Sequence, residues 1–155
     1  MSTTITYYDN VQISHVSRRI MLGEIDDALK NAESLNSKGD YYDIVAHGSS
    51  TQMHPKVNGA HKPLSANVVY AMLCKQPDYH DQPIRLISCW VGLEADGFAQ
   101  QLANLAGVPV LAATAKILVV AGEPCFYDPR DFGEPVRPSD LGPKKWIVYH
   151  PQMHA

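Results

Sequence analysis

The 155-residue chain lacks the features that would place it in a membrane or on a nucleic acid. No stretch approaches the roughly 18 consecutive apolar residues that a membrane span needs. Lysine and arginine number 13 against 16 aspartates and glutamates, which gives a net charge of −3, and the basic residues are scattered. A nucleic-acid binder usually carries a basic face or run. The composition therefore predicts no membrane span and no nucleic-acid partner.

Cysteine is scarce as well. The three cysteines, Cys74, Cys89 and Cys125, are an odd number and include no CxxC spacing. A disulfide framework or a zinc site is therefore not expected, and at least one thiol should be free. We expect no metal and no organic cofactor.

The first residues carry neither the basic segment nor the apolar segment of a secretory signal. We therefore expect a protein that is cytoplasmic when made, with secretion into a target cell by a route that needs no signal peptide as the alternative. The length suits one domain over residues 1–155, and the 45% apolar and 19% charged fractions are typical of a globular protein.

Apolar runs alternate with helical periodicities along the chain, and this alternation predicts an α/β fold. Two short strands should flank the turn pair Asp9-Asn10. Further strands are expected at 41–46, 84–88, 108–112, 116–121 and 146–150, with a proline-rich loop over 122–143. Helices are expected over about 24–36, from the cap Ser65 onward, and over about 97–106 with Asp96 as its cap. We predict a mainly parallel sheet flanked by helices, with the strands at 41–46, 84–88, 108–112 and 116–121 in one sheet.

Two reactive side chains directly follow buried strands. His47 comes after the strand at 41–46, and Cys89 comes after the strand at 84–88. Functional groups collect at the carboxyl ends of strands in open parallel sheets. If one crossover makes these two strands neighbours, about 4.8 Å apart, the imidazole and the thiol should lie within reach of each other.

This pair predicts nucleophilic chemistry. A neighbouring imidazole activates a thiol, so Cys89 would be the nucleophile and His47 the general acid–base. The backbone N–H groups of Gly48 and Cys89 would form an oxyanion hole. Flanking residues that are candidates for substrate binding are Ser49, Ser88 and Trp90. Asp43 lies too far back on its strand to orient the imidazole, and no third catalytic residue is assigned.

The segments DIVAHG (43–48) and IRLISC (84–89) resemble the two catalytic blocks of caspase-like cysteine peptidases, which include caspases, legumains, gingipains and toxin self-processing domains. The stretch SCWVGLEADGFAQQLANLAGVPVLAAT (88–114) and the late KKWIVYHP (144–151) are similar to small toxin-like domains of bacterial polymorphic secreted proteins. The resemblance covers roughly residues 41–150. The chain is shorter than typical members, and Trp90 replaces the usual small or polar residue after the cysteine.

The resemblance implies a caspase-like or flavodoxin-like three-layer sandwich and a cysteine peptidase that acts on a protein or peptide. It also implies a bacterial effector or toxin-like setting, with an immunity or activator protein as a further partner. The alternative is a non-catalytic caspase-like module that binds a protein through the same cleft, and the bulk of Trp90 encourages it. A buried structural role for the Cys89 thiol is the simplest competing interpretation.

Overall fold

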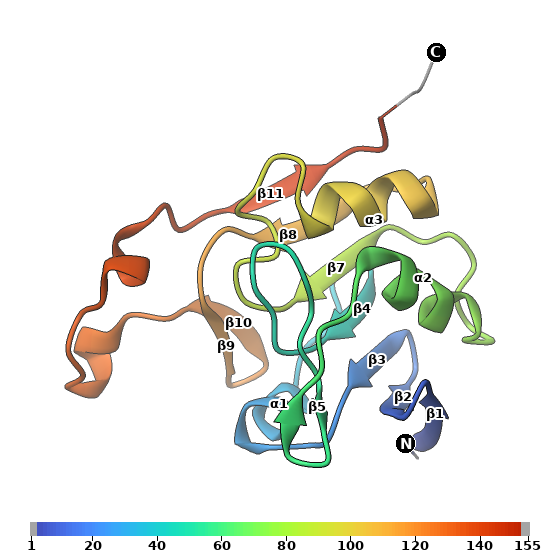
Figure 1. Ribbon diagram of the computed structural model, residues 1–155, viewed down its shortest axis with the longest axis horizontal. Coiled ribbons are helices and arrows are strands. Elements are labelled where there is room, and N and C mark those ends of the chain that lie inside the picture. Colours follow the sequence, from blue (N-terminus) through green and yellow to red (C-terminus); the bar gives the residue numbers. More distant parts are fainter. Residues whose placement is uncertain (1–2, 153–155) are drawn as a thin grey trace.

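The computed structural model describes residues 3–152, which contain a seven-stranded sheet in the order β1-β2-β3-β4-β7-β8-β11 (Figure 1). The strands are β1 (Thr4–Tyr8), β2 (Val11–Val16), β3 (Arg19–Leu22), β4 (Tyr42–Val45), β7 (Ile84–Ile87), β8 (Val110–Ala113) and β11 (Trp146–Tyr149). The central β3, β4, β7 and β8 are parallel, and the outer strands pair antiparallel. The α/β class is confirmed, and the sheet is mixed with a parallel centre.

The predicted adjacency of the two strands that precede His47 and Cys89 is confirmed. β4 and β7 are parallel neighbours, and their register runs from Tyr42 opposite Ile84 to Val45 opposite Ile87. The two strands therefore end level with each other, and each candidate residue lies two positions beyond its strand. Parallel pairing in this register is what brings the two residues to the same edge of the sheet.

Buried residues alternate between the two faces of the sheet, as strand geometry requires. Ile44 and Leu86 belong to the larger core, together with apolar residues of α2 (Ala66–Cys74) and α3 (Phe98–Ala106). The neighbouring residues on each strand, Val45 and Ile87, belong to a second core on the other face.

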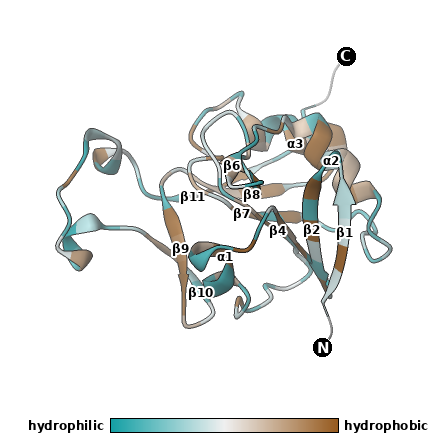
Figure 2. Ribbon diagram, turned by 60° about the horizontal axis from the view of Figure 1, so that its bottom comes forward, coloured by the Kyte–Doolittle hydropathy of each residue, from teal (hydrophilic) through white to brown (hydrophobic). Residues whose placement is uncertain are grey.

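The second face is covered more thinly than the first. It packs against α1 (Asp27–Ala32), a helix of six residues, and against a hairpin of β9 (Ile117–Val120) and β10 (Glu123–Phe126). Leu29 of α1 meets Ile117 and Val119 of β9 in this smaller core. Figure 2 shows α1 beside the apolar β9.

The prediction that residues 116–121 join the main sheet is wrong. Among the strands of the described residues, β9 pairs with β10 alone, through a two-residue turn in which Ala121 and Gly122 have φ values of 51° and 86°. Positive φ at both central positions is the geometry of a tight β-hairpin. The place beside β8 is taken by β11, so the apolar run folds beneath the sheet instead.

Two helix boundaries also differ from the prediction. The first helix is shorter than the expected 24–36, because the chain after Ala32 runs on as a turn. The third helix is capped by Gly97 rather than Asp96, and that cap makes no side-chain hydrogen bond. A Cβ at Gly97 would lie 2.7 Å from the carbonyl oxygen of Ser50, so this close approach requires a glycine. Ser65 caps α2 as expected.

The remaining segments are turns and short pieces. The expected hairpin at Asp9-Asn10 joins β1 and β2 at the sheet edge, and β5 (Lys56–Val57) pairs with β6 (Ala60–His61). The proline-rich stretch forms the 3-10 turns η1 (Pro129–Phe132) and η2 (Pro138–Leu141), in an excursion that extends away from the sheet (Figure 1). No helix within residues 3–152 combines the length and the apolar character needed to cross a bilayer.

Candidate functional site

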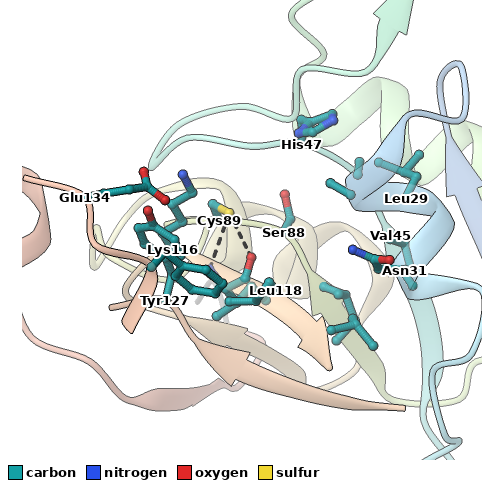
Figure 3. A pocket seen from close by; sticks show the side chains of 17 residues that line it. Leu29, Asn31, Val45, His47, Ser88, Cys89, Lys116, Leu118, Tyr127 and Glu134 are labelled. Carbon is teal, nitrogen blue, oxygen red and sulfur yellow. Dashed lines mark hydrogen bonds between the residues drawn. The ribbon is translucent and has the colours of Figure 1, made fainter. Parts of the chain in front are cut away.

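A cavity of about 440 Å³ lies at the carboxyl ends of β4 and β7 and is lined by His47, Ser88 and Cys89 (Figure 3). α1 and β9 supply most of its apolar wall. Its other polar or aromatic lining residues are Asn31, Lys116, Tyr127, Phe132 and Glu134. Two candidate catalytic residues predicted from the sequence therefore share one cavity.

The His47 imidazole is held by an acidic partner. Its Nε2 lies 2.6 Å from Oδ2 of Asp26, and the two side chains are 29% and 21% exposed. The same carboxylate oxygen lies 3.2 Å from Nζ of Lys56. On another side the ring packs edge-on against His61, with centroids 5.3 Å apart. The imidazole is thus fixed in orientation.

Asp26 has a second role, as the N-cap of α1. Its Oδ1 accepts a hydrogen bond of 3.1 Å from the Leu29 N–H, while Oδ2 faces His47. Burial alone would raise the pKa of Asp26, but the hydrogen bonds from Leu29, His47 and Lys56 outweigh it and lower the pKa to about 2. The carboxylate is therefore ionised throughout the physiological range.

The Cys89 thiol has different surroundings. Its sulfur donates to the Ile117 carbonyl at 3.5 Å and accepts from the Ile117 N–H at 3.4 Å, so it is turned toward β9 (Figure 3). Burial raises the pKa of the thiol, and the Ile117 N–H and the charge of Lys116 oppose this only in part. Within residues 3–152, no hydrogen bond joins Cys89 to His47.

Gly48 fits against the chain around Cys89 with no room for a side chain. A Cβ there would lie 2.2 Å from Oγ of Ser88, 2.9 Å from Cγ1 of Val91 and 3.1 Å from the carbonyl oxygen of Cys89. In the described part of the chain, neither the Gly48 N–H nor the Cys89 N–H donates a hydrogen bond. These two amides have their hydrogen-bonding capacity free, as an oxyanion hole requires.

The Ser88 hydroxyl also lacks a partner. Its side chain is 2% exposed, its Oγ has no hydrogen-bond partner among residues 3–152, and it lines the cavity. In Figure 3 it lies between His47 and Cys89. Buried hydroxyls are usually hydrogen-bonded, so this one is available to a bound molecule.

Two of the predicted substrate-binding residues do not line this cavity. The Ser49 hydroxyl lies within the turn that follows it, 3.0 Å from Nε2 of His54. Trp90 has a left-handed backbone, with φ of 61°, and lines an adjoining cavity of about 100 Å³. That smaller cavity shares Lys116, Tyr127 and Glu134 with the larger one.

Sequence reasoning missed Asp26, Lys116 and Glu134. In the sequence Asp26 lies in the first turn of the helix expected over about 24–36, and that place gives no sign of a contact with His47. Asp43 is not part of the site, because it pairs with Arg85 at 2.7 and 2.8 Å. Among residues 3–152, no group of three or more His, Cys, Asp or Glu side chains is arranged to hold a metal ion.

The fold and the cavity define an α/β protein with a mixed sheet and a cysteine and a histidine lining one cavity at its strand ends. Residues 16–133 match a family described as a domain of unknown function, DUF8616. The match spans most of the chain, and the protein belongs to this family. No curated protein and no solved structure matches the chain.

Proposed function

We propose that the protein is a cysteine hydrolase of the peptidase type, in which Cys89 is the nucleophile and His47 the general acid–base. One observation carries the proposal: both side chains come from the level ends of adjacent parallel strands and line the same cavity of about 440 Å³. The N–H groups of Gly48 and Cys89, which donate no hydrogen bond within residues 3–152, add to the support. Cys89 lines the cavity, and Gly48 directly follows His47.

The proposed reaction is acyl transfer. His47 takes the proton of the Cys89 thiol, and the sulfur attacks the substrate carbonyl carbon to form a C–S bond. The resulting oxyanion would be bound by the Gly48 and Cys89 amides. The C–N bond then breaks as His47 returns the proton to the leaving amine. Water, deprotonated by His47, cleaves the thioester, which releases the acid and restores the thiol.

In the resting arrangement the thiol is hydrogen-bonded to Ile117, so the reaction needs it to rotate away from β9. A change of one side-chain rotamer is a small motion on the scale of catalysis. Substrate entering the cavity would displace the thiol from the Ile117 backbone. We therefore propose that the resting enzyme holds a protonated thiol.

The caspase-like assignment is part of the same proposal. It is supported by the order of the blocks DIVAHG and IRLISC and by the parallel pairing of the strands that carry them. The three-layer arrangement would have α2 and α3 as one layer and α1 with the β9–β10 hairpin as the other. By the same resemblance, we propose a bacterial effector or toxin-like setting with a peptide or protein substrate and an immunity or activator protein as partner.

A fluorogenic peptide library together with peptidyl acyloxymethyl ketone probes tests the proposal. We expect cleavage of some library members and a covalent probe adduct on Cys89, located by mass spectrometry. Cys89→Ala and His47→Ala should both lose cleavage while remaining folded, as circular dichroism would show, because both side chains lie at strand ends. Cleavage that persists in Cys89→Ala would contradict the proposal.

A second candidate is a non-catalytic module that binds a protein through the same cavity. The observation in its favour is the thiol bound to the Ile117 backbone, with its pKa raised by burial. Buried cysteines in apolar surroundings are commonly inert. Absence of both cleavage and probe adducts, with a stable fold in Cys89→Ala, would favour this module.

A further inference from the structure

We propose that Asp26 is the positioning residue of the site, which holds the His47 ring with its proton on Nε2 and leaves Nδ1 to accept the proton of Cys89. This inference rests on the proposed function, because it assigns a role toward the Cys89 and His47 pair. It adds a third member that the two catalytic blocks do not contain, since Asp26 precedes both in the chain.

The contact itself has the geometry of an orienting pair. Oδ2 of Asp26 lies 2.6 Å from Nε2 of His47, which is the distance of a charge-assisted hydrogen bond. An ionised carboxylate only accepts hydrogen bonds, so Nε2 must carry the proton. Within residues 3–152 the other ring nitrogen, Nδ1, has no hydrogen-bond partner. Nδ1 therefore carries the free lone pair of the ring and can receive a proton.

The carboxylate is itself held in place. The Leu29 N–H binds its Oδ1, and Lys56 binds Oδ2 at 3.2 Å. Because Asp26 is the N-cap of α1, its position is fixed by a helix rather than by a mobile loop. A carboxylate fixed in this way stabilises the imidazolium that forms when Cys89 gives up its proton.

The proton-transfer step is balanced within the site. The proton moves from Sγ of Cys89 to Nδ1 of His47, which yields a thiolate and an imidazolium. Asp26 remains ionised and keeps its hydrogen bond from the Nε2–H group of His47. The charged and titratable groups that face the pair are Asp26 and Lys56, His61 against the His47 ring, and Lys116, Tyr127 and Glu134 on the cavity wall. Asp26 is the one of these that is hydrogen-bonded to the imidazole.

Variants at position 26 separate the role toward His47 from the helix cap. Asp26→Asn and Asp26→Ser both retain a side-chain oxygen that can accept from the Leu29 N–H, and Asn and Ser are good N-caps. The asparagine amide, however, would donate to Nε2 and move the ring proton to Nδ1, and serine is too short to reach the ring. Asp27→Asn is the matched control, since Asp27 is exposed on the next residue of the same helix.

The measurement is the rate at which a peptidyl acyloxymethyl ketone, which enters the cavity as a substrate would, modifies each cysteine against pH, resolved by mass spectrometry in the full chain. We expect Asp26→Asn and Asp26→Ser to modify Cys89 about tenfold more slowly near pH 7, with the midpoint of the profile about one unit higher. Asp27→Asn should match the original protein. Cys74 and Cys125, both exposed, should react at the same rate in every variant.

A variant that should shift the midpoint in the opposite direction keeps the inference testable if the Asp26 variants fail to fold. Lys56→Met leaves Asp26 in place but removes the cation that competes for Oδ2, so the carboxylate acts on His47 alone. The midpoint should then move to lower pH. Long-range proton–nitrogen spectra of the His47 ring should show the Nε2–H tautomer in the original protein and its loss in Asp26→Asn.

Failure of this inference can be told apart from failure of the proposed function. If His47→Ala slows the reaction of Cys89 but both Asp26 variants and Lys56→Met leave its profile unchanged, the positioning role is overturned and the hydrolase proposal stands. If His47→Ala also leaves the rate at which Cys89 reacts unchanged, the positioning role and the hydrolase proposal are both overturned.

Discussion

The two walls of the cavity hold their reactive groups in opposite ways. On one wall, His47 is bound to the Asp26 carboxylate at 2.6 Å, and Lys56 and His61 lie close by. On the other wall, Cys89 is bound to the main chain of Ile117, and burial raises the pKa of its thiol. The imidazole of His47 is oriented by a charged partner, whereas the thiol of Cys89 is kept in its neutral, protonated form.

This difference indicates where the site is rigid and where it has to move. An imidazole paired with a carboxylate needs no rearrangement to accept a proton. The thiol is held by two hydrogen bonds of 3.4 and 3.5 Å, and it gives them up at little cost because sulfur is a weak donor and a weak acceptor. The His47 wall is therefore the preorganised one, and the Cys89 wall is the one that responds to substrate.

The His47 wall depends on a buried ion pair behind it, and breaking that pair should have the largest effect on stability. Asp43 binds Arg85, and Arg85 also donates to the Asn36 carbonyl just beyond α1 at 2.8 Å. Asp43→Asn would leave Arg85 buried without its counter-charge and should cost about 3–5 kcal/mol of unfolding free energy. Urea denaturation measures the change.

The control for this variant is Asp40→Asn, which removes a charge from an exposed position. It should change the unfolding free energy by no more than about 0.5 kcal/mol. Equal losses in the two variants would show that the buried pair does not anchor α1, and the account of a preorganised His47 wall would lose its basis.

The junction of the two walls is Gly48, and a side chain there should have the next largest effect. In Gly48→Ala the new methyl group would meet Oγ of Ser88 at 2.2 Å and Cγ1 of Val91 at 2.9 Å. Overpacking of this kind costs about 1–3 kcal/mol. Adding Ser88→Ala removes the nearest atom, so the double variant should recover part of the loss. No recovery would mean that Ser88 is not the obstructing group.

Acid should remove the stabilisation that the Asp26 carboxylate gives to the folded protein, and should do so in a defined pH range. The pKa of Asp26 is lowered from 3.8 to about 2 in the folded protein, so its contribution to stability is complete above pH 4. That contribution is lost as the pH falls through 2. The unfolding free energy of the original protein should therefore exceed that of Asp26→Asn at pH 6, and the gap should close between pH 4 and pH 2. A gap that is unchanged at pH 2 would contradict this contribution.

The smallest effect is expected at Ser88, between the walls. Its hydroxyl is buried without a partner, so Ser88→Ala should leave the unfolding free energy unchanged or raise it by up to about 1 kcal/mol. If the hydroxyl binds substrate, the same variant should raise KM for a cleaved peptide. A clear loss of stability in Ser88→Ala would indicate a partner for the hydroxyl within the fold.

The sequence was informative where buried strands meet the sheet edge. The runs ending at Val45 and Ile87 are mostly apolar and are buried on both faces, which is typical of central parallel strands, and His47 and Cys89 follow them closely. Their adjacency was predicted from a connection that holds a single crossover helix, α2. The positions of the two candidate catalytic residues could therefore be predicted.

The rest of the cavity depends on contacts between distant segments. A four-residue apolar run such as β9 fits a sheet or a hairpin equally well, and only the pairing of β11 with β8 decides between them. The contact between Asp26 and His47 requires α1 to lie beneath the sheet. Arg19 and Arg85 hold it there by binding the carbonyls of Leu35 and Asn36. No local pattern encodes these contacts.

The most direct test of the account compares the three cysteines in one experiment. At pH 7, a peptidyl acyloxymethyl ketone should modify Cys89 faster than Cys74 and Cys125, because this probe enters the cavity as a substrate would and displaces the thiol from Ile117. Those two cysteines are exposed, whereas Cys89 is partly buried. In His47→Ala the order should reverse, because the thiol then loses its proton acceptor. If Cys89 is instead the slowest of the three in the original protein and His47→Ala changes nothing, the paired role of His47 and Cys89 is contradicted.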